Sequence, residues 1–167
     1  MKHSGRHIMV GHWKMRTTQK LTKFIEFAIS LAGLSQCSRK QVGCIIFPED
    51  FSAVEAIGYN GPPTGGGHEC TGKSGSCGCV HAEANAISKL NTAERNLILF
   101  CTWSPCIRCA GLIANTKRIS RVLYYHPWRD LPAKPILNAA GVSFEQVYCC
   151  NAMALDGDGS CDNCKGF

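Results

Sequence analysis

Two short motifs organise this chain: His81-Ala82-Glu83, and Pro105-Cys106-Ile107-Arg108-Cys109. Together they supply one imidazole and two thiols, with a carboxylate two residues beyond the imidazole. Three nitrogen and sulfur ligands leave one position of a tetrahedral zinc ion open for water, which is typical of a catalytic rather than a closed structural site. Zinc lowers the pKa of such a water toward neutrality. A carboxylate beside the metal is then placed to take a proton from that water and pass it to a leaving amine.

Each motif precedes a stretch with helical periodicity. Apolar residues follow the motifs at helical spacing, at Ala84, Ala86, Ile87 and Leu90, and at Ala110, Leu112, Ile113 and Ala114. Pro105 fits the first turn of a helix, and Cys106 and Cys109 would share one face of that turn. The partial positive charge of two helix N-termini would favour thiolate at the metal. The alternative is a CxxC pair that belongs to a zinc knuckle, which leaves the His-x-Glu motif without a role.

The motifs H-x-E and P-C-x-x-C together are the signature of zinc nucleobase deaminases. The chain resembles the cytidine and deoxycytidylate deaminase superfamily, and three segments resemble its deoxycytidylate (dCMP) branch, at 58–65, 81–87 and 104–109. The resemblance extends over about residues 13 to 148. It implies an α/β protein with a three-layer α-β-α fold and a mixed five-stranded sheet. It also implies hydrolysis of dCMP to dUMP and ammonia, which supplies dUMP for thymidylate synthesis.

The resemblance assigns roles to individual residues. His81, Cys106 and Cys109 would bind the catalytic zinc, and Glu83 would protonate the base and then the leaving amine. The substrate contacts that it suggests are Asn60, Ala82, Ser104, Arg39 and Tyr125. Three of these assignments have alternatives: a solvated loop cation at position 39, a plain Asn-Gly turn at position 60, and His126 as the contact in place of its neighbour. Trp103 fits either the wall of the pocket or the core.

A second metal site is expected in the glycine- and serine-rich segment before the first motif. Four soft ligands crowd there: His68, Cys70, Cys77 and Cys79. Such a loop has too little apolar content to order itself, and a metal would supply the missing stability. Some dCMP deaminases, which this chain resembles, carry an extra structural zinc at this place. Cys44 could replace His68, and the alternative to a metal is a reduced loop.

Hydrophobic periodicity predicts helices at 18–33 and 131–140, and strands at 42–47, 53–59, 96–103, 121–125 and 142–148. This order predicts a mixed sheet with helices on both faces. We divide the chain into a basic arm, a deaminase domain and a Cys/Gly-rich tail, at 1–16, 17–148 and 149–167. The tail could bind metal or form a disulfide through Cys149, Cys150, Cys161 and Cys164, or it could be an ordinary flexible tail.

Composition narrows the class of protein. The 167 residues, 45% hydrophobic and 18% charged, fit one globular domain. No apolar run approaches a membrane span, and the N-terminal residues lack the apolar region of a secretory signal. Twelve cysteines clustered with histidines indicate metal binding in a reducing cytosol, so we expect a cytoplasmic protein. The net charge of +6 suits an anionic partner, for which a nucleotide phosphate suffices.

Two rival functions are compatible with the motifs. One is a deaminase for another nucleotide or for a polynucleotide, such as transfer RNA adenosine or single-stranded DNA. We do not expect a nucleic-acid partner, because no basic stretch is interleaved with aromatic residues. The other is a non-enzymatic zinc module built on Cys70, Cys77, Cys79, Cys161 and Cys164. Such a module leaves Glu83 without a role. The resemblance further implies a homo-oligomer such as a hexamer, with dCTP and dTTP as effectors.

Overall fold

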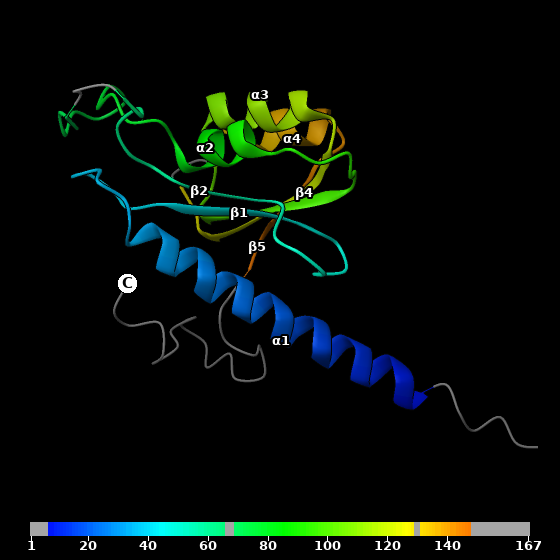
Figure 1. Ribbon diagram of the computed structural model, residues 1–167. Helices are drawn as coiled ribbons and strands as arrows, with labels where there is room; N and C mark the ends of the chain where they lie inside the picture. Colours follow the sequence, from blue (N-terminus) through cyan, green and yellow to red (C-terminus); the bar gives the residue numbers. More distant parts are fainter. Residues whose placement is uncertain (1–6, 66–68, 129–130, 148–167) are drawn as a thin grey trace, which may run out of the picture.

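A five-stranded mixed sheet forms the middle layer of the protein (Figure 1). The structure is a computed structural model that describes residues 7–65, 69–128 and 131–147. The strands lie in the order β2-β1-β3-β4-β5, with bounds β1 (Gly43–Pro48), β2 (Ala56–Tyr59), β3 (Leu97–Trp103), β4 (Ile119–His126) and β5 (Ser143–Gln146). β1 runs antiparallel to β2 and β3, whereas β3, β4 and β5 are parallel.

Helices cover both faces of the sheet, so the three-layer α-β-α prediction is confirmed. The helices are α1 (His7–Ala32), α2 (Ala82–Lys89), α3 (Ile107–Thr116) and α4 (Lys134–Ala139). α1 crosses one face, and the other three lie together on the opposite face (Figure 1). No helix in the described part of the chain has the length and apolarity that a membrane span requires.

Alternation along the strands produces two separate cores. In β1, Cys44 and Ile46 pack under α2 and α3, whereas Ile45 and Phe47 pack under α1. The central strand β3 is buried on both faces along its first six residues, which explains why its sequence reads as an unbroken apolar run rather than as an alternating one.

Two glycines let helices approach the sheet at backbone distance. A Cβ atom on Gly43 would lie 2.9 Å from the backbone nitrogen of Ala32 and closer still to a carbonyl oxygen of α1. A Cβ atom on Gly58 would lie 2.6 Å from the backbone nitrogen of Ala86 in α2. Both distances are below an ordinary van der Waals contact, so any larger residue would push the helix away. Gly58 therefore fixes the height of α2 above the sheet.

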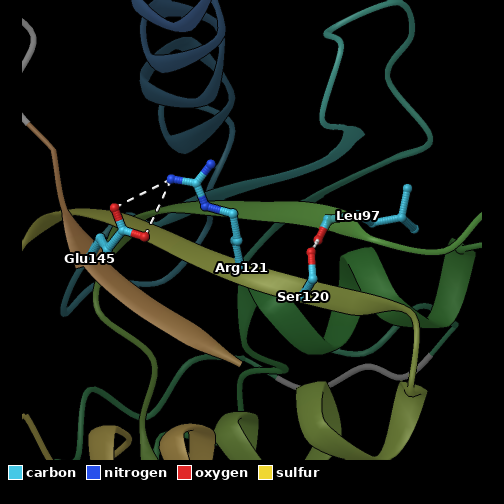
Figure 2. Close-up of polar contacts among 4 residues, drawn as sticks. All are labelled: Leu97, Ser120, Arg121 and Glu145. Carbon is cyan, nitrogen blue, oxygen red and sulfur yellow. Dashed lines mark hydrogen bonds and ion pairs between the residues drawn. The ribbon is translucent and has the colours of Figure 1, made fainter. Parts of the chain in front are cut away.

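The β4–β5 edge of the sheet carries an exposed ion pair (Figure 2). Arg121 Nη2 lies 3.3 Å from each carboxylate oxygen of Glu145. On the neighbouring residue, the Ser120 hydroxyl donates to the carbonyl oxygen of Leu97 at 3.4 Å. A pair this exposed contributes little to stability. The core packing beneath it does more to hold β5 against β4.

Several predicted boundaries were wrong. α1 begins at His7, not near residue 18, because helix-forming residues without an interrupting proline continue the helix where apolar periodicity is weak. β2 begins at Ala56 and α4 at Lys134, each later than expected. Pro105 precedes α3 and is not in its first turn, because Cys106 is the N-cap residue. The tail at 149–167, with its cysteines, lies outside the described residues.

Candidate active site

The first group of metal donors lies where α2 and α3 begin. His81 is the N-cap residue of α2, and Cys106 is the N-cap residue of α3. Both have extended backbone, and neither side chain caps its own helix, so both can turn toward a shared point. Cys109 follows in the first turn of α3. The structure thus brings together the three residues that the sequence predicted as ligands of the catalytic zinc.

The spacing of these donors fits a zinc ion. His81 Nδ1 lies 3.5 Å from Cys106 Sγ and 3.4 Å from Cys109 Sγ. A tetrahedral ion with ordinary Zn–N and Zn–S bond lengths separates a nitrogen from a sulfur ligand by about 3.6 Å. All three ligand atoms lie within 4.8 Å of one another. The distances are therefore those of neighbouring ligands of one ion.

The charges of the two thiols also favour a cation. Interaction with the Cys109 thiol lowers the pKa of Cys106 to about 3. The same interaction raises the pKa of Cys109. One thiolate is thus favoured by the protein alone, whereas a second requires a positive charge between the two sulfurs. The positive ends of α2 and α3 contribute part of it.

Glu83 is a buried carboxyl beside this centre. It stands in the first turn of α2 with 5% of its surface exposed. Burial raises the pKa of Glu83 above its ordinary value. The charge of His81 and a hydrogen bond with Cys109 lower the pKa in part, but burial has the larger effect. A raised pKa makes a carboxyl a better proton acceptor, so Glu83 is suited to take a proton and pass it on.

A cavity of about 420 Å³ opens over the metal centre. This volume is in the range of a small-molecule binding site. Of the five predicted substrate contacts, four line it: Arg39, Asn60, Ala82 and Ser104. Tyr125 is not among its described lining residues. Its side chain packs in the core beneath α1, together with Leu123 of the same strand. The two-residue period of β4 gives both residues that face.

The amide of Asn60 holds the loop that forms one wall of the cavity. Its Oδ1 accepts from the Val42 N–H at 2.8 Å and from the Ser35 hydroxyl at 2.8 Å. Its Nδ2 donates to the carbonyl oxygen of Lys40 at 2.8 Å. Most of the hydrogen-bonding capacity of this side chain is therefore engaged by the protein. Asn60 therefore holds the cavity wall in place, whether or not it also contacts a ligand.

Ser104 has a comparable role on the opposite side. Its hydroxyl accepts from the Trp128 N–H at 2.7 Å, and its own N–H donates to the carbonyl oxygen of His126 at 2.9 Å. The residue thereby ties the end of β3 to the segment that follows β4. Both segments line the cavity.

A second group of four thiols adjoins the same cavity. The group consists of Cys37, Cys70, Cys77 and Cys79, whose sulfur atoms all lie within 4.8 Å of one another. Cys37 Sγ and Cys70 Sγ are 3.7 Å apart, and two sulfur ligands of a tetrahedral zinc ion are separated by about 3.8 Å. A hydrogen bond from the Ser38 hydroxyl lowers the pKa of Cys70 to about 6, which favours thiolate.

Sequence reasoning missed Cys37. It lies in the loop after α1, far from the cysteine-rich segment, and folding brings the two together. The substitute that the sequence suggested, Cys44, was wrong: it is fully buried in β1 opposite Cys101. His68 lies outside the described residues. The one signal for Cys37 was its position in a polar loop already expected to lie near the substrate.

The site combines one imidazole and two thiols with a buried carboxylate beside them, above a five-stranded sheet. This combination defines the class of zinc-dependent nucleobase deaminases. Residues 18–126 match the family model described as the cytidine and deoxycytidylate deaminase zinc-binding region. The chain belongs to this family, and the resemblance seen in the motifs is confirmed.

Named relatives agree with this assignment. The deoxycytidylate deaminase of Saccharomyces cerevisiae is 33% identical over 137 residues, which cover 74% of this chain and 43% of the relative. That of Schizosaccharomyces pombe is 33% identical over 139 residues, covering 74% of this chain and 42% of the relative. The chain thus spans less than half the length of these curated relatives. Among solved structures, the dCMP deaminase from the cyanophage S-TIM5 in complex with dCMP and dUMP has a TM-score of 0.66 and 26% identity, covering 87% of this chain and 100% of that chain.

Proposed function

We propose that this chain is a zinc-dependent enzyme that hydrolyses dCMP to dUMP and ammonia, and so supplies dUMP for thymidylate synthesis. The observation that carries the proposal is the buried Glu83 beside a three-donor metal centre, in a cavity of nucleotide size. The cyanophage relative, described as a complex with dCMP and dUMP, supports the choice of substrate because this chain covers its whole length.

In this proposal His81, Cys106 and Cys109 would hold the zinc ion, which would supply Lewis acidity when bound. Glu83 moves the protons. It accepts one proton from the attacking water and delivers it to N3 of the cytosine ring. It then takes the remaining proton of the hydroxyl group added at C4 and passes it to the amine, which leaves C4 as ammonia. Ala82 and Ser104 also line the cavity in which the ring would lie. Burial of Glu83 keeps its proton from exchanging freely with solvent.

The test uses the purified, zinc-loaded protein and an ultraviolet absorbance assay on dCMP. Cytidine, deoxycytidine, dCTP, dAMP and a short single strand are offered in parallel. We expect Glu83→Gln to keep its zinc and to lose activity by a factor of about 100 to 10,000. Glu94→Gln, at an exposed loop position, is the matched control and should behave like the wild type. Near-normal turnover by Glu83→Gln would disprove the proton role, and conversion of another compound but not dCMP would disprove the substrate.

We also propose that Cys37, Cys70, Cys77 and Cys79 hold a second, structural zinc ion. The sulfur spacing supports this, as does the absence of any helix or strand within the described residues 69–79. Elemental analysis should find two zinc ions per chain, and Cys37→Ser should reduce the count to one. Cys44→Ser is the control and should keep two. Equal counts in the two variants would show that Cys37 is not a ligand.

The cytoplasmic location, the homo-oligomeric state and regulation by dCTP and dTTP stay predictions. Light scattering of the purified protein measures the oligomeric state, and the dCMP assay with and without each nucleotide measures the regulation. A monomer whose activity ignores both nucleotides would contradict them.

A further inference from the structure

The ammonium group of Lys40 lies over an aromatic wall of the cavity. Its Nζ is 2.9 Å from the centroid of the Trp103 ring and 4.7 Å from that of Trp128. All three residues line the cavity over the metal centre. The Trp103 ring is itself held in place, because it stacks on His126 with the centroids 4.7 Å apart. The Lys40 cation thus lies against an indole face that is held in place.

This cation has no anionic partner among the described residues. The ion pairs found in residues 7–65, 69–128 and 131–147 are Lys23–Glu26 and Arg121–Glu145. Arg39, beside Lys40, donates from Nη2 to the hydroxyl of a serine in the cysteine-rich loop. Among the described residues that line the cavity, the single carboxylate is the buried Glu83.

The described lining of the cavity therefore carries more cations than carboxylates. Its one acidic group stands at the metal centre, and its described cationic lining residues are Arg39, Lys40 and Arg108. Partial burial and the charge of Arg39 lower the pKa of Lys40, as expected for an ammonium without an anion nearby. A ligand with an anionic group and an aromatic ring would satisfy both the cations and the indole face.

We propose that Lys40 is the residue by which this chain distinguishes a nucleoside monophosphate from the corresponding nucleoside. The 5′-phosphate would draw the ammonium off the Trp103 face and pair with it, next to Arg39, and the vacated indole face would contact the rest of the nucleotide. A charge-assisted hydrogen bond to phosphate is stronger than a half-exposed cation–π contact, so the exchange is favourable. The inference rests on the proposed function and adds to it a residue for specificity.

The backbone around Lys40 suits such a movement. Its carbonyl oxygen accepts from Asn60 Nδ2 at 2.8 Å, so the main chain is fixed while the side chain can swing. The guanidinium of Arg39, in contrast, is tied to the loop by its hydrogen bond to Ser74 at 3.1 Å. Lysine carries a compact charge on four flexible carbons, which fits a group that changes partner.

The experiment compares kcat/KM for dCMP with kcat/KM for deoxycytidine. We expect Lys40→Met, which keeps the apolar stem over Trp103, to lower the ratio of the two by about tenfold. Lys40→Arg restores the charge and should recover most of the ratio. Lys89→Met is the matched control, because Lys89 also lies over a ring, 5.8 Å from the centroid of Tyr59, but is not among the cavity's described lining residues.

A binding measurement gives a readout apart from turnover. Tryptophan fluorescence is titrated with dUMP and with deoxyuridine in the wild type and in Lys40→Met. We expect the substitution to raise the Kd for dUMP about tenfold more than it raises the Kd for deoxyuridine. Equal losses for nucleotide and nucleoside would assign Lys40 to packing alone and overturn the inference. Normal dCMP activity with an unmoved ratio would refute this inference and leave the proposed function standing. A wild-type protein that deaminates neither compound would refute the proposed function, and the inference with it.

Discussion

Gly58 of β2 lies beneath α2 at a point where a methyl group has no room. A Cβ atom there would lie 2.6 Å from the backbone nitrogen of Ala86, and closer still to the carbonyl oxygen of Ala82. Both atoms belong to the backbone, so no rotamer change relieves the conflict. To reach an ordinary contact of 3.4 Å from 2.6 Å, α2 must move by at least about 0.8 Å, and the closer contact with Ala82 requires a larger shift. Because α2 carries His81 and Glu83 at its start, Gly58→Ala should displace both from the thiols of α3.

A shift of this size should be costly to catalysis. A misplacement of about 1 Å at an active site can lower the rate by about 100-fold. We therefore expect Gly58→Ala to lower kcat/KM for dCMP by a factor of about 10 to 100. Overpacking should also lower the free energy of unfolding by about 1–3 kcal/mol.

Gly43→Ala is the control, because it creates the same conflict on the other face of the sheet. A Cβ atom on Gly43 would press on α1, against the backbone of Ala28 and Ala32. α1 carries none of the metal donors or the carboxylate. This variant should lose a similar amount of stability and keep most of its activity.

Three measurements on each variant decide the outcome: urea denaturation, bound zinc by elemental analysis, and steady-state kinetics with dCMP. The reasoning fails if the two variants lose stability equally and activity equally, since the direction of the displacement would then not matter. It also fails if the activity lost by Gly58→Ala is no greater than its unfolded fraction.

Three further predictions concern the loops and the hairpin. Asn60→Ala should lower the free energy of unfolding by about 1–3 kcal/mol, because the partly buried N–H of Val42 loses its acceptor; an unchanged urea midpoint would contradict this. Hydrogen bonds from Ser52 lower the pKa of the Asp50 carboxyl in the folded protein. These bonds therefore stabilise the fold at pH values above the unfolded-state pKa of about 3.9, and the stabilisation is lost as the pH falls through the lower pKa of the folded state. Asp50→Asn should accordingly lower Tm at pH 7, and the difference from the wild type should vanish in strong acid. Removal of zinc by a chelator should speed amide hydrogen exchange in residues 69–80 more than in β3, and uniform acceleration would argue against a structural metal in that loop.

The sequence alone predicted the features that depend on local pattern. The motif around His81 and the motif around Cys106 each stand next to a helical repeat, which predicted the two helices that follow them. The approach of the two motifs to one another was expected from the resemblance, and the structure brings them together. The pattern at 96–103 predicted a strand, and β3 confirms it.

Features that depend on long-range folding could not be predicted in this way. Cys37 has no cysteine or histidine next to it in sequence, and it meets Cys70 only because the loop after α1 folds over the cysteine-rich segment. Tyr125 was proposed as a substrate contact on resemblance, but a one-residue difference in the register of a strand decides which face receives a side chain. The start of α1 lacks apolar periodicity, the signal on which its boundary was predicted.

A short chain of hydrogen bonds joins the four-thiol group to the backbone of Lys40 in the cavity wall. The Cys37 N–H donates to Ser35 Oγ at 3.2 Å, the Ser35 hydroxyl donates to Asn60 Oδ1, and Asn60 Nδ2 donates to the carbonyl oxygen of Lys40. The four-thiol group therefore fixes the wall that carries the cations, whereas the catalytic donors stand on α2 and α3. A metal in the four-thiol group would set how the substrate is held without touching the reacting atoms. Damage there should raise KM before it lowers kcat, which distinguishes a structural ion from a catalytic one.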